Sequence, residues 1–180
     1  IVAIGCGNGD VLLWDLMRGI VSKTIKESIY RDEHVTDICF HNDGDSFFVC
    51  NKDTEDVHEY SIQDGSKKHT WKGIKKGITK LVFNPQANIL ACAGPTLKII
   101  DVGNTQKSKK REFDVQFRKG VSDMHFSDCG KYLACGSIGS KELLIFNIQA
   151  DASSLKPMAV IPRKEYVRSI RSIVNESKNR

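Results

Sequence analysis

The chain has 180 residues, of which 40% are hydrophobic and 27% are charged, with a formal net charge of +5. This composition is typical of a globular protein that is large enough to bury a core, and it excludes a low-complexity chain. No apolar run approaches the roughly 18 residues of a membrane-spanning helix, so we expect no membrane partner.

The first 26 residues predict three short strands at Ile1–Cys6, Val11–Leu16 and Ile20–Lys26. The first two are joined by Asn8-Gly9, a pair that favours a tight hairpin because both residues tolerate positive φ. The first strand begins at once, which is not the pattern of a signal peptide. We therefore expect the chain to be a piece of a longer protein, with a first unit that lacks its innermost strand.

A repeated unit follows. Its first strand begins with an apolar residue and two polar residues, and further apolar residues follow. Four copies are present: Val35–Phe40, Ile78–Phe83, Val121–Phe126 and a degenerate Val167–Ser172. Successive copies begin 43, 43 and 46 residues apart. A second marker ends the third strand of each unit, at intervals of 46, 40 and 46: Trp14-Asp15, Tyr60-Ser61, Ile100-Asp101 and Phe146-Asn147. No helical period runs through the units, which excludes helical repeats. A period of about 40 to 45 residues with a Trp-Asp pair is typical of four-stranded propeller blades.

The segment Val11–Leu16, VLLWDL, and the repeats around it resemble the WD-repeat family. The resemblance implies an all-β WD-repeat β-propeller with four-stranded antiparallel blades, here a partial ring of about four blades. The expected blades span residues 1–26, 35–72, 78–114 and 121–161, the next blade starts at 166–174, and 175–180 is a tail or linker. Propeller rings close with about four to eight blades, so we expect further blades outside this chain. In this family the polar residue after the third strand supports the neighbouring turn, and Trp14, Tyr60 and Phe146 are expected to pack between blades.

The chain has enough cysteines and histidines to bind a metal ion, but their spacing does not favour a metal site. Four cysteines fall at what looks like one position per repeat: Cys6, Cys50, Cys92 and Cys135. Equivalent positions on successive blades fan out around a ring and do not converge on one ion, so we interpret them as small buried side chains. The five histidines are scattered without a metal-binding or catalytic spacing. We expect no metal, no cofactor and no catalytic residue, and reduced cysteines indicate the cytosol or nucleus.

Clustered positive charge is the feature that points to a partner. Connections after the fourth and second strands of a blade share one face of a propeller, and six cations fall there on three consecutive blades: Lys75, Lys76, Arg118, Lys119, Arg163 and Lys164. Three more are expected at the opposite rim: Lys109, Lys110 and Arg111. Such a stripe attracts phosphates through counterion release. The alternative is a solvated surface that keeps strand edges soluble, and no aromatic residue clearly interleaves the stripe to stack bases.

The order of further motifs resembles one subgroup of the family. They are Gly9–Trp14, Arg18–Val21, His34–Ile38, Val57–Tyr60, Trp71–Gly73 and Ala93–Lys98. In this order they resemble the WD-repeat subunit of the UTP-A subcomplex of the small-subunit processome, over residues 5–148. The resemblance implies a nucleolar, non-catalytic scaffold of ribosome biogenesis. Its partners would be other WD-repeat subunits of a large assembly and the 5′ external spacer of the ribosomal RNA precursor. Ser61 and Asn147 depart from the family, because they stand where it has Asp.

Two other functions stay open. A WD-repeat adaptor would read a peptide or degron at the central channel, with an affinity insensitive to salt. A propeller enzyme would need convergent polar residues at the channel mouth, and the inner strands offer mainly Asp37, Lys80 and Asp123. These single residues on separate blades could equally line a water-filled channel, so we expect no enzyme and no small-molecule substrate.

Overall fold

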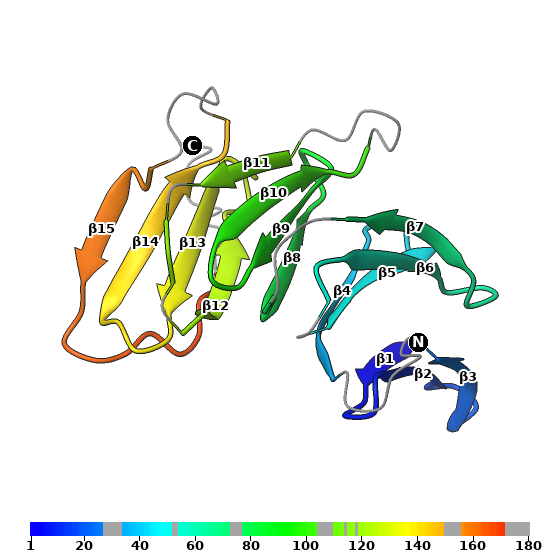
Figure 1. Ribbon diagram of the computed structural model, residues 1–180. Coiled ribbons are helices and arrows are strands. Elements are labelled where there is room, and N and C mark those ends of the chain that lie inside the picture. The colour runs from blue at the N-terminus through cyan, green and yellow to red at the C-terminus, as the bar shows by residue number, and fades with distance from the viewer. Residues whose placement is uncertain are drawn as a thin grey trace, which may run out of the picture.

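The computed structural model describes residues 1–26, 34–51, 54–72, 77–103, 110–113, 115–117, 119–149 and 156–171, with only the backbone of 110–112. These residues form four antiparallel sheets that follow one another along an arc (Figure 1). Within this described part, no helix is long and apolar enough to cross a membrane. The all-β fold of four-stranded antiparallel blades, expected from the repeat period, is confirmed.

Each sheet is a meander in which consecutive strands pair. The first blade has three strands, β1 (Val2–Gly5), β2 (Asp10–Asp15) and β3 (Ile20–Lys26). The second has β4 (Val35–Phe40), β5 (Ser46–Asn51), β6 (Val57–Ser61) and β7 (Lys67–Trp71). The third has β8 (Lys80–Asn84), β9 (Ile89–Ala93), β10 (Leu97–Asp101) and β11 (Lys110–Phe113). The fourth has β12 (Val121–Phe126), β13 (Tyr132–Ser137), β14 (Glu142–Asn147) and β15 (Ala159–Pro162).

The hydrophobic core lies between the blades and is divided into three clusters, one for each pair of neighbours. Tyr60 on β6 packs with Leu13 on β2 between the first and second blades. Trp71 on β7 packs with Leu90 on β9 between the second and third, and Phe146 on β14 lies between the third and fourth. Strands with apolar side chains on both faces, such as β5 and β9, are fully buried because they contribute to two clusters at once.

The outer faces of the first and last blades have no neighbour among the described residues. Val2 and Ile4 on β1 are exposed, as is Ile161 on β15. Apolar side chains on these faces are therefore in contact with solvent, which is unfavourable for a blade. The expectation that further blades cover them stays a prediction.

Neighbouring blades are linked near the axis by a repeated hydrogen bond from a hydroxyl group. The Thr36 Oγ1 donates to the carbonyl of Ile78 at 2.8 Å, and the Thr79 Oγ1 donates to that of Val121 at 3.4 Å. The Ser122 Oγ donates to the carbonyl of Val167 at 2.7 Å. In each link, the second residue of one repeat motif reaches the first residue of the next.

Asp37 and Asp123 on the inner strands also bond to the segment that follows their own blade, so they do not stand free in a channel. The Asp37 Oδ2 accepts the amide N–H of Leu81 at 2.8 Å, and the Asp123 Oδ2 accepts that of Ile170 at 2.8 Å and the Arg171 guanidinium at 3.0 Å. Burial raises the pKa of Asp37. Burial acts in the same direction on Asp123, but its hydrogen bonds and Arg171 outweigh it and lower the pKa. Asp37 therefore binds the neighbouring blade, and Asp123 binds the segment that follows the fourth blade.

The polar residue that ends each third strand caps the turn that follows, as the family resemblance implies. The Asp15 Oδ1 accepts the N–H of Met17 at 2.9 Å, and the Asp101 Oδ1 accepts that of Gly103 at 3.1 Å. Ser61 and Asn147 make the equivalent bonds to the N–H groups of Asp64 and Gln149. The aromatic partners are less uniform, because Tyr60 and Phe146 are buried, whereas Trp14 is only partly buried.

The alignment of four cysteines at one repeat position is wrong. Cys92 pairs with Lys98 and Cys135 with Leu144, and both side chains face the preceding blade. Cys50 pairs with Val57 and faces the following blade, while Cys6 lies beyond the end of β1 and is partly exposed. A shift of one residue along a strand reverses the face, because side chains alternate. The interpretation as packing residues holds for the three buried thiols, and burial raises the pKa of Cys50 to about 12.

The expected strand over 166–174 is not formed in its described part, residues 166–171. Its first residues nevertheless sit where an inner strand would. Val167 lies against Gly136, where an added Cβ would be 2.7 Å from its Cγ1, just as Val35 lies against Gly5. That this segment opens a further blade stays a prediction, and residues 172–180 lie outside the described residues.

His58 gives a test of the packing between the first two blades. Burial, and then the charge of Lys67, lower the pKa of its imidazole from 6.5 to about 4, and the Nδ1 is 2.8 Å from the Oγ1 of Thr70. Unfolding restores the ordinary pKa, so the unfolded chain binds this proton first. We expect the melting temperature to fall as the pH drops from about 6.5 to about 4, and to fall less in His58→Gln. Equal pH profiles would contradict this role.

Candidate nucleic-acid interface

Three of the nine cations expected to contact a partner can be placed with their side chains, and all three are exposed. Lys119 precedes β12, while Arg163 and Lys164 follow β15. Lys75, Lys76, Lys109 and Arg118 lie outside the described residues. Lys110 and Arg111 form part of the backbone of β11, where they pair with Ile100 and Ile99, and their side chains are not described.

Two connections of the fourth blade meet at the end where these cations lie. The turn between β13 and β14 and the segment after β15 both form its lower end in Figure 1. They are joined by a backbone hydrogen bond from the amide N–H of Arg163 to the carbonyl of Lys141, at 2.7 Å. The antiparallel meander thus brings Lys141 beside Arg163 and Lys164. Lys141 was missed in the sequence, although the same rule for connections would have placed it on this face.

An exposed aromatic ring lies among these cations. Tyr166 is 54% exposed, and the Nζ of Lys141 is 5.5 Å from the centre of its ring. Lys119, Tyr166 and Arg168 line one open hollow of about 370 Å³, which Ile138 and Gly139 also line. The expectation that no aromatic residue interleaves the basic stripe is therefore wrong. The signal was present in the sequence as a tyrosine within Arg163-Lys-Glu-Tyr-Val-Arg168.

The balance of charge at this end of the blade is positive. Five exposed side chains carry a positive charge, namely Lys119, Lys141, Arg163, Lys164 and Arg168. The nearby carboxylates are Glu142, which accepts a hydrogen bond from Ser140 at 3.2 Å, and Glu165, which lines a second hollow with Arg163 and Lys164. We name these five cations with Tyr166 the blade-four patch.

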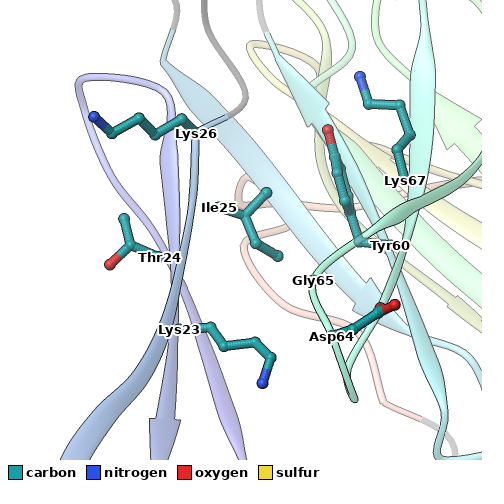
Figure 2. Close-up of a pocket in the computed structure, with 8 residues that line it drawn as sticks. All are labelled: Lys23, Thr24, Ile25, Lys26, Tyr60, Asp64, Gly65 and Lys67. Atoms are coloured by element: carbon teal, nitrogen blue, oxygen red, sulfur yellow. The ribbon is translucent and has the colours of Figure 1, made fainter.

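A different hollow opens between the outer strands of the first and second blades. Figure 2 shows Ile25 and Tyr60 pointing toward each other across it, while Thr24 and Lys26 point away. The Nζ of Lys67 is 5.4 Å from the centre of the Tyr60 ring. Tyr60 is only 3% exposed, so this hollow offers no aromatic face to a ligand. It is the space left where two blades diverge from the axis.

The described residues contain no group of three or more histidine, cysteine or acidic side chains placed to hold a metal ion. Among the histidines, His34 contacts the carbonyl of Gly7 through its Nδ1, and the His41 Nε2 is 3.2 Å from the Oδ1 of Asn88. These contacts join neighbouring blades, and the His41 ring also packs against Phe48 and Phe83.

Comparison with known proteins agrees with the architecture. No protein-family model matches the chain. Over 100 residues, or 55% of its length, it is 30% identical to WD repeat-containing protein 43 from Homo sapiens, of which it covers 14%. Its structure matches the β-propeller domain of Cps50 (Swd1) from Myceliophteria thermophila with a TM-score of 0.73, over 94% of this chain and 54% of that one, at 14% identity. The chain has a β-propeller fold.

The chain spans about half of the Cps50 domain and a seventh of the human relative. Its sheets correspond to part of a propeller, in agreement with the arc in Figure 1. The fold by itself does not select a partner. The partner has to be argued from surfaces such as the blade-four patch.

Proposed function

We propose that this chain is part of a non-catalytic scaffold of ribosome biogenesis in the nucleolus. It would act in the small-subunit processome with other WD-repeat subunits, and contact the ribosomal RNA precursor in its 5′ external spacer. The scaffold role is supported by the propeller fold. The processome role rests on the order of motifs from Gly9–Trp14 to Ala93–Lys98.

One observation carries the interaction with RNA. Five exposed cations gather at one end of the fourth blade, brought there by three segments that are separate in sequence: the one before β12, the turn between β13 and β14, and the one after β15. Exposed lysines and arginines on a rigid sheet can neutralise phosphates and release their counterions. Such binding weakens with salt, whereas an adaptor that reads an uncharged peptide would bind equally well at all salt concentrations.

The test is binding of the full-length protein to a labelled 5′ spacer RNA at several salt concentrations. The variant replaces Lys119, Arg163 and Lys164 by serine. For single-stranded RNA, the salt slope becomes shallower by about 0.7 for each phosphate that is no longer neutralised, so we expect a change of about 2 in total. Affinity at moderate salt should fall with it.

A matched control replaces three exposed cations at the opposite ends of the blades, namely Arg18, Lys131 and Lys156. This variant has the same net charge as the first but should keep the wild-type slope. Equal losses of affinity in both variants would show that RNA binding depends on the total charge of the protein and not on the blade-four patch. No binding by the wild type would refute direct RNA binding and leave a scaffold that acts through proteins alone.

A further inference from the structure

We propose that Tyr166 stacks on an unpaired base, so that the blade-four patch selects single-stranded RNA over duplex RNA. This inference rests on the proposed function, because it assumes that RNA is the partner. It adds the class of RNA and the residue that recognises it. Duplex RNA offers phosphates to the same cations, but its bases are stacked on one another and cannot reach the ring.

The backbone of the segment that carries Tyr166 is anchored to β12 by hydrogen bonds. Tyr166 directly precedes Val167, whose carbonyl accepts the hydrogen bond of the Ser122 Oγ, and three residues further on Ile170 donates to Asp123. The segment therefore has defined anchors on the inner strand of the fourth blade. A ring on an anchored segment loses little conformational freedom when a ligand binds.

The surroundings of the ring match a nucleotide. Even with the Lys141 ammonium 5.5 Å from the ring centre, Tyr166 keeps 54% of its surface exposed, so a flat base can reach it. Lys119 and Arg168 line the same hollow and can bind the phosphates on either side of a stacked base. Single-stranded nucleic-acid sites combine these two elements, a cationic track and an aromatic platform.

An acidic peptide would also be attracted by the cations, but its carboxylates would make no favourable interaction with the ring of Tyr166. A carboxylate gains nothing from the face of an aromatic ring, which carries partial negative charge. A base has an aromatic face of its own and stacks on tyrosine. The combination of ring and cations therefore favours RNA.

The experiment measures binding of the full-length protein to three probes: a short single-stranded RNA, the same RNA in a duplex, and an abasic strand with the same number of phosphates. We expect Tyr166→Ala to weaken binding to the single strand by about 5- to 150-fold, the range of one base–aromatic stack. Tyr166→Phe should bind like the wild type. The salt slope should not change, because the tyrosine neutralises no phosphate.

Tyr132→Ala is the matched control, because Tyr132 is also exposed but begins β13 at the other end of the blade. The wild type should bind the abasic strand about as weakly as Tyr166→Ala binds RNA. Equal affinity of the wild type for intact and abasic strands would overturn the stacking, as would wild-type binding by Tyr166→Ala.

The outcomes separate this inference from the proposed function. If the triple cation variant loses affinity and Tyr166→Ala does not, RNA binding stands and stacking is wrong. If neither variant has an effect on any probe, both proposals fail. Competition by polyglutamate that is as strong as competition by RNA, and equally weakened in Tyr166→Ala, would point to an acidic peptide and overturn the inference.

Discussion

Replacing Trp71 by alanine should lower the free energy of unfolding by about 3 to 5 kcal/mol, the range for large aromatic side chains deleted from a core. The indole is 1% exposed and fills the space between the second and third blades. Its ring lies 5.6 Å from that of Phe48 and 4.4 Å from that of His69, measured between centres. Denaturant-induced unfolding of the full-length protein measures the loss of stability.

Two further variants show whether the packing is responsible. The Nε1 of Trp71 has no hydrogen-bond partner among the described residues, so Trp71→Phe removes an unsatisfied donor and should cost much less than Trp71→Ala. Trp14→Ala should also cost less, because Trp14 is only partly buried. A similar loss of stability in Trp71→Ala and Trp14→Ala would mean that burial of Trp71 between the second and third blades does not determine the size of its effect.

Gly94→Ala is expected to destabilise the third blade by about 1 to 3 kcal/mol, as overpacking of a core does. An added Cβ would lie 2.8 Å from the carbonyl carbon of Gly77 and 3.1 Å from the Cα of Ile78. These are backbone atoms, which cannot rotate away as a side chain can. The chain before β8 would have to move, and the bond from the amide of Thr79 to Ala93 would be strained.

Gly7→Ala is the control for this substitution. Its added Cβ would meet only the Nδ1 of His34, at 3.5 Å, an ordinary van der Waals distance. The melting temperature of the full-length protein should therefore fall clearly in Gly94→Ala and hardly change in Gly7→Ala. Equal stability of the two variants would show that the backbone at Gly94 relaxes without cost.

The architecture could be predicted from the sequence because two markers repeat with one period. The motif that begins at Val35 and the pair at Trp14-Asp15 report different strands of a blade, and their agreement leaves few alternatives to a propeller. The capping by Asp15 and Asp101 also followed from the family pattern. Periodicity gives the number and order of strands well.

Periodicity does not give the register of a strand to one residue. Cys50 and Cys92 are 42 residues apart, close to the period, yet they face each other's blade from opposite sides of one interface. A turn that is one residue longer or shorter moves a side chain to the other face of the sheet, although the spacing between repeats hardly changes. Tyr166 was missed for another reason, because proximity to Lys141 depends on the pairing of Arg163 with Lys141 across two strands.

The hydroxyl links between blades all point the same way along the chain. Thr36, Thr79 and Ser122 each donate to a carbonyl that comes 42, 42 and 45 residues later. During synthesis from the N-terminus, each of these hydroxyl groups would thus emerge before its acceptor in the following segment. Until then Thr36 and Thr79 can bond only within their own blade, to the carbonyls of Cys50 and Ala93, so the arrival of the next blade adds a second acceptor to each.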